Sequence, residues 1–285
     1  MKRWFVLLLL LFLNPNIVIA DGVLWIAPHP DDETTIAPLL ADYCIDQEKE
    51  CHFLLTTRGQ YATKCLLPEG CEPDIATIRE KELNQSVALF NAEINFLDIR
   101  YGNKERSYDE EFHSIFEDQI PIIAEKIESI NPELILVFNP QHGVTCHHEH
   151  LKTGSLVTDA VEQIGFPKEK LYYVDSAAMI KGTIKNTEWA GFAPFQSNND
   201  VEVIDSKNWD YTSKVIQIYR SSFESSTAEA YNNAPLKARN IYLLRSNKLE
   251  EGQYKQAYKD ICIDGNRIID VDSTIEEKSS HENII

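Results

Sequence analysis

Apolar runs alternate with segments of helical periodicity along most of the chain. Short continuous apolar runs predict buried strands at 23–27, 51–56, 94–99, 134–138, 171–174 and 241–244. Apolar residues at three-to-four spacing predict helices over 34–43, 75–90, 110–130, 149–164 and 209–223. Because strands that alternate with helices are typical of βαβ units, the pattern predicts an α/β fold with a mostly parallel sheet covered on both faces.

The two ends of the chain differ from this pattern. Lys2 and Arg3 precede an apolar stretch, 4–13, that is too short to span a bilayer, and Val18-Ile19-Ala20 offers a small-residue cleavage site. We therefore expect a signal peptide over 1–20, with a retained membrane anchor as the alternative, and a secreted or periplasmic protein. One domain over 21–271, with no later membrane span, and an acidic mobile tail over 272–285 complete the predicted organisation.

The charge balance limits the partners. The chain has 45 acidic and 27 basic side chains, a net charge of −18. This balance argues against nucleic acid or an anionic membrane surface as the main partner. It indicates neither a particular partner nor an oligomeric state.

The six cysteines fit an exported protein, because export permits disulfides. Cys44 with Cys51, and Cys65 with Cys71, would each close a short local loop, and we prefer these pairs among the connectivities that six cysteines allow. Cys146 could bind a metal, pair in a disulfide or be a buried thiol.

The first candidate for chemistry is "HPDDE", 29–33, directly after the first predicted strand. Pro30 disfavours helical geometry at His29, so the imidazole and the Asp32 carboxylate can converge as ligands of a divalent metal such as zinc. A metal would also stabilise adjacent carboxylates, and Asp31, if unbound, could act as a general base. The alternative is an ordinary helix start, in which acidic residues complement the helix dipole. In either case Glu33 would only favour the helix start.

The second candidate follows the fourth predicted strand. Half of the chain's eight histidines lie between positions 142 and 150. His147 and His150, three residues apart at the predicted beginning of a helix, would share one face. In an open parallel sheet ligands bind at the carboxyl ends of the strands, so this loop can supply the ligand that the first motif lacks if the two strands are neighbours. Solvated loop residues are the alternative.

These segments resemble a known family. "APHPDDE" (Ala27–Glu33) resembles the A-H-P-D-D-E signature of the PIG-L, or LmbE-like, de-N-acetylases, and "HGVTCHHEH" (His142–His150) resembles their second motif, D-G-V-[ST]-G-H-x-D-H. "LTTRGQ" (Leu55–Gln60) and "REKE" (Arg79–Glu82) lie where the family has a T-x-G loop and an R-x-x-E helix. Residues 205–222 are loosely similar to its D…K…H-x-S-Q helix.

The resemblance implies a Rossmann-like three-layer α/β fold and removal of an acetyl group from an N-acetylated amino sugar such as GlcNAc. It further implies that His29, Asp32 and His150 bind zinc. Asp31 would be the general base, and His147 would help to stabilise charge on the substrate carbonyl. Zinc is not the only possibility, because histidine and carboxylate ligands also suit iron, cobalt or manganese.

Arg79 is a candidate for substrate binding, with an ordinary helix ion pair to Glu82 as the alternative. The chain also departs from the family pattern. Pro28 is inserted before the histidine, and the helix ending in Tyr219-Arg220-Ser221-Ser222 lacks the family's His and Gln. His142, Cys146 and Glu149 stand where the second motif has Asp, Gly and Asp.

Three functions fit these observations. The first is an exported zinc-dependent N-deacetylase acting on an N-acetylated sugar or glycoconjugate. The second is a non-catalytic protein of the same fold that binds a glycan or another partner. The third is an amidase acting on a non-sugar N-acyl substrate. Retention of Asp31 favours an enzyme, because a binding protein does not need a general base.

Overall fold

The computed structural model describes residues 22–99, 116–176 and 201–248, and these form one mixed sheet with helices on both faces. The predicted signal peptide, the acidic tail and the first part of the predicted helix 110–130 lie outside the described residues. The strands are β1 (Gly22–Ala27), β2 (Glu50–Leu55), β3 (Glu93–Phe96), β4 (Leu134–Phe138), β5 (Leu171–Ser176), β6 (Glu202–Asp205) and β7 (Asn240–Arg245).

The helices connect these strands. The α-helices are α1 (Ala37–Ala41), α2 (Ile75–Ala88), α4 (Ile120–Ile130), α5 (Gly143–Cys146), α6 (His148–Ile164), α7 (Asp210–Ile218) and α8 (Ser225–Asn232). Shorter turns are the 3-10 segments η1 (Asp32–Thr35), η3 (Lys168–Lys170), η5 (Leu236–Arg239) and η6 (Ser246–Lys248) and the π-helical turn η2 (Asp42–Asp46).

The strand order is β3-β2-β1-β4-β5-β7-β6. The first five strands in this order run parallel, whereas β7 is antiparallel to both β5 and β6. The predicted α/β class and mostly parallel sheet are confirmed. The order also makes β1 and β4 neighbours, which is the condition for the two candidate loops to meet.

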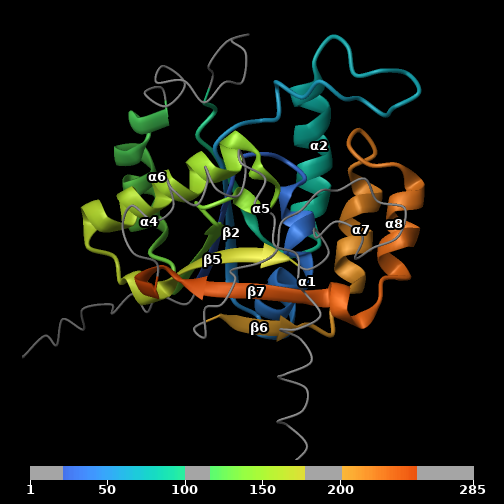
Figure 1. The fold of residues 1–285 in the computed structure, drawn as a ribbon. Coiled ribbons are helices and arrows are strands. Elements are labelled where there is room, and N and C mark those ends of the chain that lie inside the picture. Colours follow the sequence, from blue (N-terminus) through green and yellow to red (C-terminus); the bar gives the residue numbers. More distant parts are fainter. Residues whose placement is uncertain (1–21, 100–115, 177–200, 249–285) are drawn as a thin grey trace, which may run out of the picture.

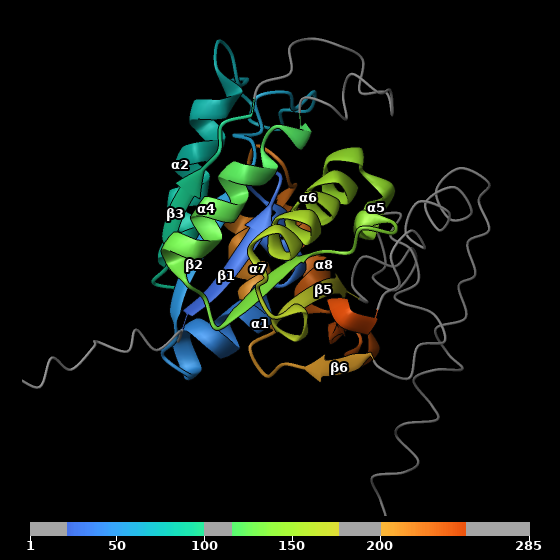
Figure 2. The same cartoon turned by 90° about the vertical axis from the view of Figure 1, so that its left-hand side faces the viewer.

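Alternate residues of the central strands pack into two cores. Trp25 of β1 and Phe53 of β2 lie in the core that also contains residues of α1, α2 and α7. Leu24 and Ile26 point the other way, into the core formed with α4 and α6. Figures 1 and 2 show these two helical layers on opposite sides of the sheet. Burial on both faces explains why these strands are continuously apolar.

Several predicted boundaries need correction. The predicted helix 110–130 is interrupted at 118–119 within its described part, because Pro121 lies in the first turn of α4 and has no N–H to continue a preceding helix. The predicted helix 34–43 is broken at Ile36 into η1 and α1. The strand β6 and the helix α8 were not predicted: β6 is an edge strand with three of its four residues exposed, and α8 is short and begins with the polar residues Ser225, Ser226 and Thr227.

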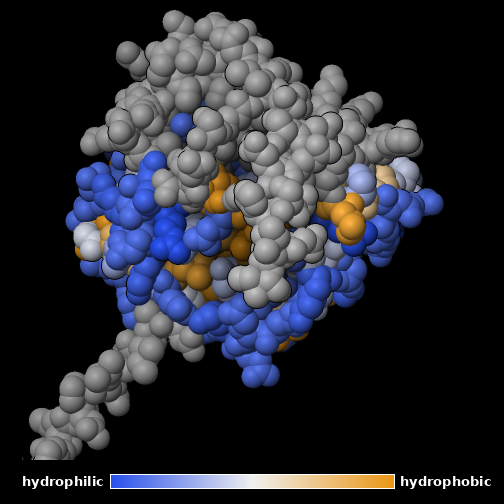
Figure 3. Space-filling model, turned by 60° about the horizontal axis from the view of Figure 1, so that its bottom comes forward, coloured by the Kyte–Doolittle hydropathy of each residue, from blue (hydrophilic) through white to orange (hydrophobic). Residues whose placement is uncertain are grey.

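Both preferred disulfides are present, Cys44–Cys51 and Cys65–Cys71. Cys146 is also disulfide-bonded, so it is not a metal ligand. Among the described residues, none of the helices has the length and apolar character needed to cross a membrane. On the face seen in Figure 3, the described surface is largely hydrophilic, with hydrophobic side chains in the middle.

Candidate active site

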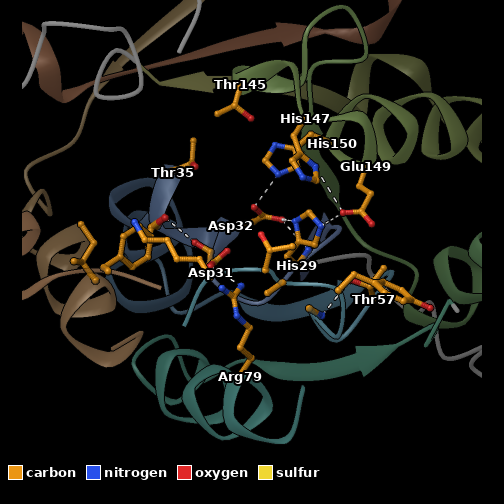
Figure 4. A pocket seen from close by; sticks show the side chains of 18 of the residues that line it. His29, Asp31, Asp32, Thr35, Thr57, Arg79, Thr145, His147, Glu149 and His150 are labelled. Carbon is orange, nitrogen blue, oxygen red and sulfur yellow. Dashed lines mark hydrogen bonds and ion pairs between the residues drawn. The ribbon is translucent and has the colours of Figure 1, made fainter. Parts of the chain in front are cut away.

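The two candidate loops meet at one edge of the sheet. β1 and β4 are parallel neighbours, with Ile26 paired to Val137 near the ends of both strands. His29 follows β1, whereas His147 caps α6 and His150 lies in its first turn, after β4. Figure 4 shows these side chains around one pocket. The structure therefore brings together all six predicted site residues, which all line this pocket: His29, Asp31, Asp32, Arg79, His147 and His150.

The first motif forms a tight turn that brings His29 and Asp32 together. The backbone N–H of His29 donates a hydrogen bond to Asp32 Oδ2 at 2.8 Å, and the Thr34 hydroxyl donates to the Asp31 carbonyl at 2.6 Å. Asp31 itself has a left-handed backbone, with φ of 101°. For a residue with a side chain, such a conformation costs about 1–3 kcal/mol and persists only where the surroundings hold it.

Imidazoles and carboxylates converge beside this turn. One nitrogen each from His29, His147 and His150 lies within 4.8 Å of the others. Asp32 contacts two of these rings, with Oδ1 3.1 Å from His150 Nε2 and Oδ2 3.3 Å from His29 Nδ1. Figure 4 shows these side chains pointing toward one another. A cluster of imidazole nitrogens and a carboxylate is a donor set that zinc accepts.

The electrostatics of the cluster fit a cation. Burial disfavours charge on His29, but the carboxylates of Glu149 and Asp32 outweigh it and raise the pKa of His29 to about 10. Burial alone would raise the pKa of Asp32, but His150 and His29 hold it well below its usual range. Glu149 contacts His29 Nε2 through one oxygen, and its other oxygen, Oε1, is buried without a hydrogen-bond partner. A divalent cation would satisfy these carboxylates, so the residues present fit a metal.

Asp31 lies beside the cluster, opposite Arg79. Its Oδ2 accepts a hydrogen bond from Arg79 Nη1 at 2.8 Å. Burial raises the pKa of Asp31, although the Arg79 guanidinium opposes the shift. Arg79 does not form the alternative helix ion pair, because Glu82 instead accepts hydrogen bonds from the backbone N–H and hydroxyl of Ser221. The structure thus places Arg79 against the predicted base, at the wall of the pocket.

The prediction that Glu33 only favours the helix start is wrong. Its side chain is fully buried, and Oε1 accepts hydrogen bonds at 2.5 Å from the hydroxyls of Ser86 in α2 and Tyr219 after α7. Burial raises the pKa of Glu33 to about 7, despite these donors. This contact was not predictable from the local sequence, because Ser86 and Tyr219 lie far from Glu33 along the chain.

The loop after β4 and the start of α6 hold the second set of candidate ligands. His150 Nδ1 contacts the Gly143 carbonyl at 2.9 Å, which turns Nε2 toward Asp32. His142, the residue before Gly143, is buried beside Asn139 and Asp175. Its Nε2 lies 2.9 Å from Asn139 Nδ2. Burial lowers the pKa of His142 to about 4. This buried polar group supports the loop and does not line the pocket.

One functional candidate was missed. Glu149 lies in the first turn of α6, is almost fully buried and contacts His29. The available signal was its place between His148 and His150, where the resembling motif has Asp.

Apolar and aromatic side chains also line the pocket. They are Tyr61 from the loop after β2, Ile216 from α7, Phe223 from the segment before α8, and Tyr231 from α8. A pocket that combines a polar cluster with aromatic side chains is suited to a polar organic molecule with an exposed apolar face.

Comparisons with known proteins agree with this architecture. The profile of the family described as PIG-L, GlcNAc-PI de-N-acetylase, matches residues 24–161. A probable N-acetyl-alpha-D-glucosaminyl L-malate deacetylase 2 of Bacillus cereus is 30% identical over 199 residues, which cover 65% of this chain and 78% of that relative.

Solved structures share the fold at low identity. A deacetylase of teicoplanin biosynthesis, in complex with teicoplanin, aligns with a TM-score of 0.57 at 13% identity, covering 79% of this chain and 99% of that one. The 4-carboxy-2-hydroxymuconate hydratase of Pseudomonas putida aligns with a TM-score of 0.52 at 17% identity, covering 75% and 83%. At such identities the likeness shows the fold alone.

The sheet order and its two helical layers define an α/β protein with the fold of the solved deacetylase structures. The chain belongs to the PIG-L family of GlcNAc-PI de-N-acetylases. The family resemblance seen in the two motifs is confirmed.

Proposed function

We propose that this protein is an exported, zinc-dependent hydrolase that removes the acetyl group from an N-acetylated amino sugar. The observation that carries the proposal is the convergence of three imidazoles and the Asp32 carboxylate beside Asp31 in one pocket. Family membership supports deacetylation, and the name of the B. cereus relative supports an N-acetylglucosaminyl substrate.

Burial favours one set of ligands over another. The side chains of Asp32, His150 and His29 are 7%, 10% and 15% exposed, whereas that of His147 is 33% exposed. We assign zinc to the three buried side chains, because three protein ligands leave a position open for water or substrate. His147 is then the imidazole that faces the substrate.

The chemistry needs a base beside the metal. A bound zinc ion would act as a Lewis acid and lower the pKa of water toward about 7. Asp31 accepts the proton of the water whose oxygen attacks the amide carbon, and it passes this proton to the nitrogen of the departing amine. The carbon–nitrogen bond breaks, and the products are acetate and the free amino sugar.

Two neighbours assist this proton transfer. Arg79 holds the Asp31 carboxylate by the 2.8 Å hydrogen bond from its Nη1. His147 donates a hydrogen bond to the carbonyl oxygen as negative charge develops there. The predicted role of Arg79 in substrate binding stays part of this proposal, since its side chain lines the pocket.

The aromatic side chains of the pocket support a sugar substrate. Tyr61, Phe223 and Tyr231 line the pocket, and aromatic rings are surfaces against which the apolar face of a pyranose can pack. Lys64 is an exposed residue among the described side chains that line the pocket. The proposal does not require the aglycone of the substrate to be charged.

Export is part of the proposal. Its supports are the signal-peptide pattern in the first twenty residues and the disulfides Cys44–Cys51 and Cys65–Cys71. Disulfides persist in oxidising compartments and are rare in the cytosol of mesophiles.

The test is an acetate-release assay with the purified protein loaded with one divalent metal at a time. The substrates are GlcNAc glycosides with neutral, acidic and aromatic aglycones, together with N-acetyl amino acids and N-acetyl peptides. The proposal predicts release from the GlcNAc glycosides, with zinc among the active metals. Release only from amino acids or peptides would establish the amidase alternative, and release from none of them would overturn the proposed activity.

A matched pair of variants tests the base. Asp31→Asn should lower turnover by about 10³-fold or more with metal content unchanged. Asp205→Asn, an exposed carboxylate on β6, is the control and should turn over at the rate of the unmodified protein. Full activity of Asp31→Asn would remove Asp31 from the mechanism.

A further inference from the structure

A buried polar cluster lies directly under Asp31. We propose that Glu33 and Tyr219 are positioning residues that hold the Asp31 turn in the conformation required for proton transfer. The inference rests on the proposed function, in which Asp31 is the base, but it concerns residues that neither the sequence motifs nor the comparisons assign to a role.

The cluster joins three separate parts of the chain. Glu33 belongs to η1, Ser86 to α2, and Tyr219 directly follows α7. All three side chains are fully buried, in a core that is otherwise apolar. Because an unpaired carboxylate in such surroundings is costly, the two hydroxyls that donate to Glu33 Oε1 at 2.5 Å are part of what keeps this residue inside.

The cluster also reaches the backbone of the base. The N–H of Asp31 donates toward Glu33 Oε2 at 3.3 Å, and the other oxygen of the same carboxylate accepts from the Tyr219 hydroxyl. Tyr219 therefore acts on the Asp31 turn through the Glu33 carboxylate. Through this pair, the turn is anchored to the helical layer formed by α2 and α7.

Such an anchor is needed because the turn is strained. Asp31 has a φ of 101°, a conformation that side-chain-bearing residues adopt only when their surroundings enforce it. The same turn sets the direction of the Asp31 carboxylate, which contacts Arg79. Loss of the Tyr219 hydroxyl would loosen the turn that carries Asp31 without removing any side chain that faces the substrate.

A purely structural role is the competing explanation, because any lost buried hydroxyl destabilises a protein. Tyr173 offers a matched control: it is as buried as Tyr219, and its hydroxyl is 2.7 Å from Thr158 Oγ1 on the opposite face of the sheet. Tyr173→Phe and Tyr219→Phe should therefore lower the melting temperature by similar amounts. Only Tyr219→Phe should affect the chemistry.

The experiment is a double-mutant cycle on acetate release with the metal-loaded protein. Tyr219→Phe should lower kcat by about tenfold, with KM and metal content within about twofold of the unmodified protein. Tyr173→Phe should stay within about twofold in both constants. In an Asp31→Asn background, Tyr219→Phe should lower the residual rate by less than about twofold, because it acts through Asp31. Equal losses in both backgrounds, or an unchanged kcat, would overturn the inference.

A crystal structure of Tyr219→Phe provides a readout independent of activity. We expect Asp31 to leave its left-handed conformation or to lose its contact with Arg79, while Tyr173→Phe keeps both. An unchanged Asp31 turn in Tyr219→Phe would overturn the inference. If the unmodified protein releases acetate from no substrate, the proposed function fails, and these two crystal structures alone decide the positioning role.

Discussion

Gly143 is the most sensitive backbone position of the site. It has a φ of +55°, and its carbonyl orients His150. A Cβ added at Gly143 would lie 2.6 Å from the His150 Cβ and 2.9 Å from the Leu151 backbone nitrogen. We predict that Gly143→Ala weakens zinc binding by displacing His150.

The magnitude follows from two separate costs. The positive φ costs a residue other than glycine about 1–2 kcal/mol of folding stability. Carbon atoms in contact lie about 3.5–4.0 Å apart, so the His150 backbone must also move away by about 1 Å. Disturbing the orientation of a ligand in this way typically weakens metal binding by about 10–100-fold.

Gly165 separates these two costs. It ends α6 with a φ of +66°, but an added Cβ there would meet nothing within 4 Å. Gly165→Ala should therefore lose a similar amount of stability, a fall in melting temperature of about 2–4 °C per kcal/mol, and keep the zinc affinity of the unmodified protein. The assay is zinc competition against a chromophoric chelator, together with thermal unfolding of both variants. Equal zinc affinities for Gly143→Ala and Gly165→Ala would show that a side chain at Gly143 does not displace His150 from the metal.

Three further predictions concern the surroundings of the site. Arg79→Met should lower kcat/KM by at least about tenfold while zinc content stays constant, because loss of the guanidinium removes the largest effect that opposes the rise in the pKa of Asp31 caused by burial. A metal analysis and a pH–rate profile check this, and an unshifted profile would contradict it. Burial lowers the pKa of His142 to about 4, so the unfolded chain binds a proton at this residue below about pH 6.5, whereas the folded chain does not bind it until about pH 4. The free energy of unfolding should therefore fall as the pH is lowered from about 6.5 to about 4, and urea unfolding should show a shallower fall in His142→Gln. An equal fall in the two proteins would contradict this prediction. Replacing Cys44 and Cys51 together by serine should lower the free energy of unfolding by about 2–3 kcal/mol, because the short loop is no longer closed, and should leave zinc affinity unchanged. Chemical denaturation measures the loss of stability. A loss of zinc would contradict the separation of this disulfide from the site.

The fold was predictable where burial requires an apolar sequence. β1, β2 and β4 are continuously apolar because helices cover both of their faces, and their predicted positions agree with the structure to within a residue or so. β6 could not be found in this way, because an exposed edge strand needs no apolar pattern. The break before α4 depends on Pro121, which cannot continue a preceding helix although the apolar periodicity runs through it.

The convergence of the site was predictable for a topological reason. The motif after β1 and the histidine-rich loop after β4 meet because the two strands are neighbours, and their chemical complementarity indicated this in advance. The roles of Glu33 and Glu149 were not predictable in the same way. Each depends on a tertiary contact, Glu33 with Tyr219 and Glu149 with His29, and the local sequence is equally compatible with a solvated first turn of a helix.

The central claim is that Asp32, His29 and His150 hold a divalent cation beside Asp31. Anomalous diffraction at the zinc edge, from crystals of the zinc-loaded protein, tests it most directly. The account predicts one strong peak per chain in this pocket, about 2.0–2.2 Å from one nitrogen of each of the two imidazoles and from an Asp32 oxygen, with His147 outside bonding distance. A peak bonded to His147 in place of Asp32 would contradict the ligand assignment, and the absence of a peak in the pocket would contradict the claim itself.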